Sequence, residues 1–264
     1  MVTGLPKPSA GLPAPGPSWL AGQTGCVAGP RIVLTEAAVA ALIESGATVE
    51  SLFDGEGEAA IEEIEKGRGP LDFLVLAPPS IQPGAASAIS PDSWRIECTD
   101  PLGRLASMAI GYGKRRVADR RGGSILFLTN GLAEGGTAGA LTGAIVDAGI
   151  ETLTRALAAE WAGHDIRVNS VVAGLFGADD ARQRLNLSSS SDLARTVPAH
   201  RFGEPRELGW AVSWLSSGFA AYITGATLTV DGGHHLRRQL LDPAISARLS
   251  AGGEIAGGKA GLAE

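Results

Sequence analysis

Short apolar runs alternate along the middle of this chain with longer segments of helical period. The runs lie at residues 73–77, 124–129, 167–172 and 227–230, and the helical segments at 36–44, 102–118, 142–161 and 205–216. Each run is short and nearly all apolar, as is typical of a strand buried on both faces. The alternation therefore predicts βαβ units that form a parallel sheet.

The length of 264 residues favours one α/β domain over two. Aromatic residues make up only 5% of the chain and 37 residues are glycine, so we expect a core of small aliphatic side chains with helices packed closely on the sheet. Segments rich in Pro and Gly bound this domain. We expect an N-terminal arm at residues 1–21, the domain at 22–236 and a C-terminal tail at 237–264.

Charge and cysteine content exclude several classes of function. The net charge of −6 comes without a basic block, which disfavours nucleic acid and anionic membranes as partners. Cys26 and Cys98 lie far apart and have no metal-ligand spacing, so we expect neither a disulfide nor a zinc site, and a cytoplasmic location. His234 and His235 are adjacent and would point opposite ways on an extended chain, so we expect no metal there.

Four blocks in the second half of the chain resemble the short-chain dehydrogenase/reductase family in order and spacing. They are LTRALAAEWA at 153–162, IRVNS at 166–170, RFGEP at 201–205 and YITGATLTVDGG at 222–233. The resemblance covers about residues 25–235 and implies a single-domain, Rossmann-like, doubly wound parallel sheet flanked by helices. It also implies that Asn169 and Asp231 are scaffold positions rather than chemical groups.

The resemblance implies a glycine-rich turn for a dinucleotide between the first strand and the first helix. The corresponding segment, residues 29–35, reads GPRIVLT, and only Gly29 remains of the glycines. Val33 and Thr35 stand where the second and third glycines belong, and Thr35 with Glu36 is typical of an ordinary helix start. We therefore expect no bound nicotinamide cofactor, with Gly29 as a remnant.

The resemblance also implies a catalytic set of Ser, Tyr and Lys with an Asn from an earlier helix. In this chain the Ser position falls on Asn130, the Tyr on Gly143, the Lys on Asp147 and the Asn near Pro101. Gly143 has no group that could supply a proton. We therefore expect no catalytic residues in the sense of the family.

Four polar residues remain as candidates for a pocket: Asn130, Glu134, Thr142 and Asp147. Asp147 and Glu134 would form an acid/base pair if buried, whereas on a solvated helix face Asp147 would be exposed or paired with an Arg. Such a pocket would accept a small-molecule ligand.

Three hypotheses of function remain open. The favoured one is a non-catalytic structural or regulatory subunit that assembles with an active dehydrogenase of the same family, for example one acting on an acyl-CoA hydroxy substrate. It predicts a homo- or hetero-oligomer that is no active dehydrogenase on its own. The alternatives are a non-redox lyase, isomerase or cyclase in the former substrate pocket, and an atypical NAD(P)-dependent reductase.

Overall fold

The computed structural model describes residues 18–53, 57–79, 84–131, 139–177 and 197–237. Six parallel strands form one sheet in the order β2-β1-β3-β4-β5-β6. The strands are β1 Thr24–Gly29, β2 Thr48–Phe53, β3 Phe73–Leu76, β4 Gly123–Thr129, β5 Ile166–Ala173 and β6 Thr227–Val230. The α-helices are α1 Val33–Glu44, α2 Glu58–Arg68, α3 Pro91–Trp94, α4 Asp100–Ala118, α5 Leu141–Trp161 and α8 Pro205–Ser216.

Five short helical turns complete the described elements. They are η1 Ala86–Ala88, the π-helical η2 Arg95–Thr99, η3 Ala162–His164, η4 Gly218–Ala220 and η5 His234–Arg237. The predicted fold class is confirmed, and all four predicted strands and all four predicted helices are present. The sequence did not predict α2, whose apolar face is narrow because Ile61 is its one fully buried side chain.

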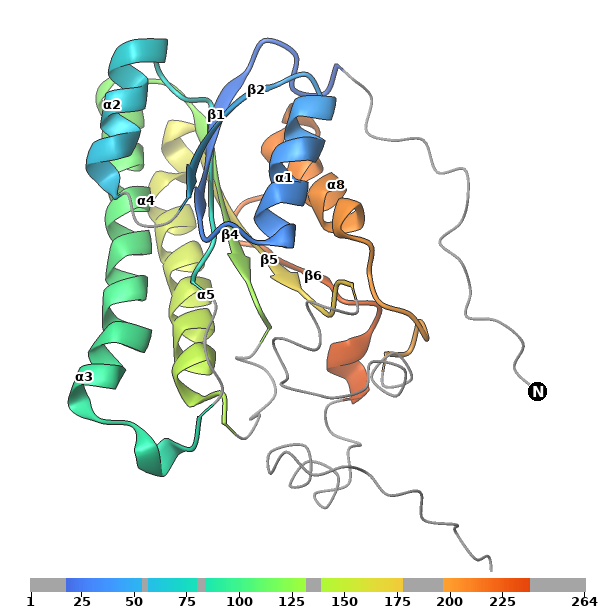
Figure 1. The fold of residues 1–264 in the computed structure, drawn as a ribbon. Helices are drawn as coiled ribbons and strands as arrows, with labels where there is room; N and C mark the ends of the chain where they lie inside the picture. The colour runs from blue at the N-terminus through green and yellow to red at the C-terminus, as the bar shows by residue number, and fades with distance from the viewer. Residues whose placement is uncertain (1–17, 54–56, 80–83, 132–138, 178–196, 238–264) are drawn as a thin grey trace, which may run out of the picture.

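Two layers of helices cover the sheet (Figure 1). Helices α1 and α8 pack on one face, while α2, α4 and α5 pack on the other. Each face has its own apolar core: Leu42, Val75 and Val212 belong to the first, and Leu74, Ile125 and Ile150 to the second. This three-layer arrangement is expected for strands that are apolar on both faces.

Helices α1 and α8 approach each other closely at Gly209. A Cβ atom at this position would lie 2.6 Å from the Ala37 carbonyl oxygen and 2.7 Å from the Ala41 Cβ. Only a residue without a side chain fits such a contact, so Gly209 sets how closely the two helices pack.

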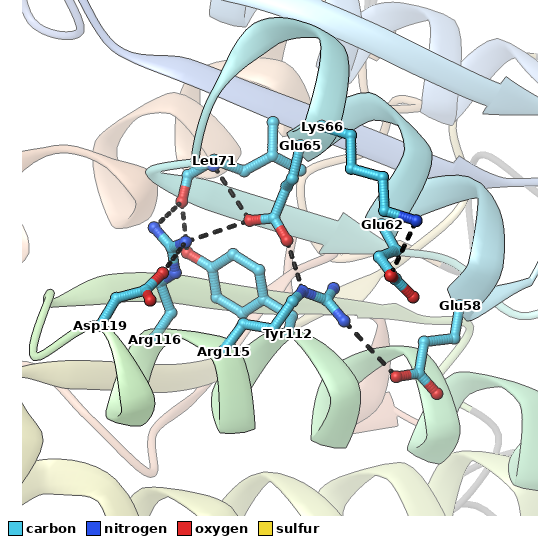
Figure 2. A network of polar contacts seen from close by, with 9 residues as sticks. All are labelled: Glu58, Glu62, Glu65, Lys66, Leu71, Tyr112, Arg115, Arg116 and Asp119. Atoms are coloured by element: carbon cyan, nitrogen blue, oxygen red, sulfur yellow. Dashed lines mark hydrogen bonds and ion pairs between the residues drawn. The ribbon is translucent and has the colours of Figure 1, made fainter.

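Charged side chains join α2 and α4 on the opposite face of the sheet (Figure 2). We call Glu65, Leu71, Tyr112, Arg115 and Arg116 the α2–α4 network. Arg116 donates to the Leu71 carbonyl oxygen at 3.0 Å and to Glu65 at 3.2 Å, and Arg115 also donates to Glu65. Tyr112 donates to the same carbonyl oxygen at 3.1 Å, and burial raises the pKa of its hydroxyl.

The described end of the N-terminal segment packs against this domain. Leu20 is fully buried and its N–H donates to the Ser45 carbonyl oxygen at 2.8 Å. The Trp19 ring meets the Phe219 ring edge-on, with 5.3 Å between the ring centroids. Among the described residues, no helix combines the length and the apolar character needed to cross a membrane.

Candidate active site at the carboxyl edge of the sheet

The carboxyl ends of the six strands meet at one edge of the sheet, and the strand order reverses between β1 and β3. Open α/β sheets bind ligands outside this edge, at the point where the order reverses. There the ends of β1 and β3 pack closely. A Cβ atom at Gly29 would lie only 2.8 Å from the Ala77 carbonyl oxygen. Gly29 is thus required for packing between the two strand ends.

The turn that joins β1 to α1 is short, and the helix begins at Val33 rather than at Glu36 as predicted. Thr35 lies in the first turn and is fully buried. Its hydroxyl oxygen accepts from the Ile32 N–H at 3.1 Å, and its hydroxyl donates to the Pro30 carbonyl oxygen at 2.7 Å. Thr35 therefore closes the turn from within the helix instead of preceding it as a cap.

Arg31 is a basic group of this turn that the sequence analysis did not single out. Its guanidinium lies 5.1 Å from the centroid of the Phe53 ring, at the end of β2, and 4.0 Å from the Glu36 carboxylate. Both the Arg31 and the Glu36 side chains are more than half exposed. A guanidinium beside the start of a helix is suited to a phosphate group, because both favour negative charge.

Asp147 is fully buried in α5 and contacts the segment that follows β4. Its two carboxylate oxygens lie 3.3 and 3.2 Å from the Asn130 N–H, which donates to them. The structure thus brings two of the predicted candidates together. Of the two alternatives for Asp147, the structure has the buried one, because this face of α5 packs toward the sheet.

Thr142, in the first turn of α5, is also buried and donates its hydroxyl hydrogen to the Glu97 carboxylate at 3.0 Å. Glu97 belongs to the π-helical turn η2 that leads into α4. Such turns are rare and are frequent at functional sites. Sequence analysis missed Glu97, since neither the π-helical turn nor a contact with a residue 45 positions away can be predicted from local sequence.

The remaining candidate, Glu134, lies outside the described residues, so its pairing with Asp147 stays a prediction. Both cysteines are buried, and burial raises the pKa of the Cys98 thiol. No group of His, Cys, Asp and Glu side chains that could hold a metal ion occurs in the described ranges.

Comparison with known proteins identifies the family. A family model described as enoyl-(acyl carrier protein) reductase matches residues 36–235. The 3-oxoacyl-(acyl-carrier-protein) reductase FabG of Vibrio cholerae is 36% identical over 179 residues, which cover 68% of this chain and 72% of that protein. This chain belongs to the short-chain dehydrogenase/reductase family. The family assignment made from the sequence is thereby confirmed.

A second relative of this short-chain dehydrogenase/reductase, named as a probable 2,4-dienoyl-CoA reductase of Caenorhabditis elegans, is 34% identical over 125 residues. The match covers 46% of this chain and 40% of that protein. The chain thus spans less than half the length of that relative. A solved structure of a 2-deoxy-D-gluconate 3-dehydrogenase from Agrobacterium tumefaciens, with bound NADP, is 24% identical with a TM-score of 0.67. It covers 84% of this chain and 99% of that protein, and it shows the fold.

These comparisons overturn two expectations from the sequence. The favoured hypothesis of a non-catalytic subunit was wrong, because the family model and the relatives are named as oxidoreductases. The expectation of no cofactor is contradicted as well, since the relatives are named as reductases and a solved structure of the same fold holds NADP. Both expectations were drawn from missing groups, the glycines of residues 29–35 and the Ser, Tyr, Lys and Asn of the catalytic set, and missing groups alone do not show which residues take their place.

Proposed function

We propose that this chain is an atypical NAD(P)-dependent oxidoreductase that reduces a ketone or a double bond in the acyl chain of a thioester. The main support for this proposal is the match to the reductase family model over residues 36–235. Two relatives are named as reductases of acyl groups held as thioesters, one on acyl carrier protein and one on coenzyme A. The enzyme is atypical because Gly143 and Asp147 stand where the resemblance places Tyr and Lys.

On the cofactor side, the proposal assigns the phosphates to the β1–α1 turn. Arg31 and the N-terminus of α1 offer positive charge there, and Arg31 lies against Phe53 beside the neighbouring strand end. The charge of Glu36 opposes phosphate, but its carboxylate is 4.0 Å from the Arg31 guanidinium, which offsets it. A bound nicotinamide nucleotide would supply a hydride to the substrate.

On the substrate side, the proposal assigns polar contacts to Asn130 and Thr142. Asp147 accepts from the Asn130 N–H and so fixes the backbone after β4. Glu97 accepts from Thr142 and so fixes the rotamer of that hydroxyl. Groups that are held in this way orient a substrate with little loss of side-chain entropy on binding.

The proposal extends to the assembly and its location. Large apolar side chains are exposed at Phe219, Tyr222 and Leu236, at 67%, 104% and 67% of their full surface. Because such a surface is typical of subunit contacts, we propose a homo-oligomer. A chain with two cysteines far apart in sequence, Cys26 and Cys98, fits a reducing compartment, and we propose the cytoplasm.

Calorimetric titration with NADPH and NADH tests the cofactor part of the proposal. We expect binding of at least one of them, weakened about tenfold, or by about 1.4 kcal/mol, in Arg31→Ala. Arg68→Ala is the matched control, because Arg68 is a similarly exposed arginine, at the end of α2, that pairs with Glu50 of β2. No binding of either nucleotide at millimolar concentration would overturn the proposal.

Oxidation of the bound nucleotide, followed at 340 nm with acetoacetyl-CoA and with a 2,4-dienoyl-CoA, tests the substrate part. We expect Thr142→Val to lower kcat/KM on the active thioester about tenfold while nucleotide affinity stays unchanged. Thr152→Val is the matched control, since the Thr152 hydroxyl is exposed on α5 and donates to its own helix. Turnover of neither thioester would contradict the proposed substrate class.

A further inference from the structure

An aspartate and a histidine form a close pair directly after the last strand. The Asp231 carboxylate oxygen Oδ2 lies 2.8 Å from His235 Nδ1 and accepts from the His235 backbone N–H at 2.7 Å. The other oxygen, Oδ1, accepts from the Gly233 N–H at 2.8 Å. Asp231 therefore holds the whole turn from residue 231 to residue 235, with the imidazole ring at its end.

The chemistry of this pair follows from its partners and its exposure. The Asp231 side chain is 6% exposed and the His235 side chain 35%. Burial pushes the pKa of Asp231 upward, but the hydrogen bonds from His235 and Gly233 outweigh it and hold the pKa below its usual value. An ionised carboxylate at Nδ1 favours the imidazole tautomer with hydrogen on that nitrogen, which leaves Nε2 to exchange a proton.

The pair lies at the same edge of the sheet as the candidate active site. Asp231 follows β6, and a Cβ atom at Gly174, which follows β5, would lie 2.5 Å from the Asp231 Cα. Asn130 follows β4, two strand spacings away, or about 10 Å. Figure 1 shows η5, which carries His235, beyond the carboxyl ends of β5 and β6.

We propose that Asp231 and His235 form the acid/base pair that gives the substrate its proton. This proposal rests on the proposed reductase function. When a 3-oxo thioester is reduced, the ketone carbon gains a hydride from the reduced nucleotide, and the π electrons of the C=O bond move to oxygen. That oxygen takes the proton that the imidazolium form of His235 carries on Nε2. The neutral ring that remains keeps its hydrogen on Nδ1, against Asp231, and the one-third exposed side chain takes a proton back from water on Nε2.

The proposed reaction needs a proton donor, and His235 can supply one. Gly143 cannot donate a proton, and the buried Asp147 already accepts from the Asn130 N–H. Among the described histidines at this edge, His235 has its ring nitrogen fixed by a carboxylate on the strand end itself. Asp231 acts through His235 and is therefore a positioning residue.

A purely structural role of the pair makes a different prediction. The two backbone N–H groups of Gly233 and His235 bind Asp231 whatever the side chain at position 235. His235→Ala therefore keeps the turn and removes only the ring. His164→Ala is the matched control, since His164 lies in η3 at the amino end of β5.

The first test measures kcat, nucleotide affinity and rescue by free imidazole. We expect His235→Ala to lower kcat at least 100-fold, with nucleotide affinity unchanged and with activity partly restored by added imidazole. His164→Ala should change none of these. Unchanged kcat in His235→Ala, or a loss that imidazole does not restore, would overturn the proposal.

The second test needs no turnover. We expect 15N spectra of the histidine rings to show His235 with hydrogen on Nδ1, and its Nε2 signal to shift when acetoacetyl-CoA is added. Asp231→Asn should abolish the Nδ1–H preference. Absence of any shift at Nε2 on adding acetoacetyl-CoA, in a protein that binds the nucleotide, would sink the pair as a proton donor and leave the reductase function standing. Absence of nucleotide binding would sink the reductase function and, with it, the role of the pair in reduction.

Discussion

The α2–α4 network and the Asp231–His235 pair both join charged groups, yet the basic groups of Arg116 and His235 differ in their exposure to water. In the network, Arg116 is 1% exposed and Glu65 9% exposed, and each has more than one partner. In the pair, the ring of His235 is 35% exposed and one of its nitrogens faces a carboxylate. Buried charged groups with several partners hold elements together. An imidazole ring that is one-third exposed and hydrogen-bonded at one nitrogen can instead exchange protons with water.

The same contrast separates the two edges of the sheet. Leu71 and the end of α4 lie at the amino edge, where the network ties α2 to α4 (Figure 2). At the carboxyl edge, the hydrogen bond from Thr142 to Glu97 joins α5 to η2. Changes at the amino edge should therefore cost stability, and changes at the carboxyl edge should cost activity.

The largest expected effect on stability is that of Arg116→Met. Loss of the buried guanidinium leaves the Leu71 carbonyl oxygen and the Glu65 carboxylate short of partners. We expect a loss of about 3 kcal/mol in the free energy of unfolding, measured by denaturant titration. The control, Arg121→Met, removes an arginine that is half exposed and 3.8 Å from Asp72, and should cost well under 1 kcal/mol. Equal losses in the two variants would break the contrast.

A smaller effect is expected for Tyr112→Phe. The ring remains in the core, and only the hydrogen bond to the Leu71 carbonyl oxygen is lost. We expect the free energy of unfolding to fall by about 1 kcal/mol, with kcat unchanged at temperatures where the variant stays folded. A change in kcat without a change in stability would place Tyr112 in the chemistry and refute the division between the two edges.

The smallest effect concerns an ion pair at the start of α8. Glu207 accepts two hydrogen bonds of 2.7 Å from Arg201, which hold the pKa of its carboxyl below its usual value. A lowered pKa in the folded state stabilises the fold above the unfolded pKa, and this contribution is lost as the pH falls through the folded value. Thermal unfolding of Glu207→Gln should therefore depend less on pH below about pH 4.5 than that of the wild type. Parallel curves would contradict this.

The fold was predictable from the sequence because its signals are local. Strands that are apolar on both faces, and a helix start such as Pro205 followed by Glu207, can be recognised from neighbouring residues. The structure adds that Glu207 also accepts from the Glu204 N–H at 2.8 Å, so it caps α8 as well as pairing with Arg201.

The candidate site was predictable only in part. Asn130, Thr142 and Asp147 were found from their places after a strand and in a helix, but the burial of Asp147 depends on which face of α5 meets the sheet. Glu97 could not be found, since its partner Thr142 is distant in sequence. The Asp231–His235 pair could have been found, because an Asp four residues before a His is a local spacing; it was treated as scaffold instead.

Close packing at Gly209 has a mechanical consequence. Helix α1 starts at the turn that carries Arg31, and α8 starts beside Arg201, so the two helices reach the ligand edge at separate places. At their close approach, position 209 contributes no side chain that could change its rotamer to absorb a shift of one helix against the other. A ligand that shifts the turn before α1 would therefore shift α8 as well, so the two helices would move as one rigid body.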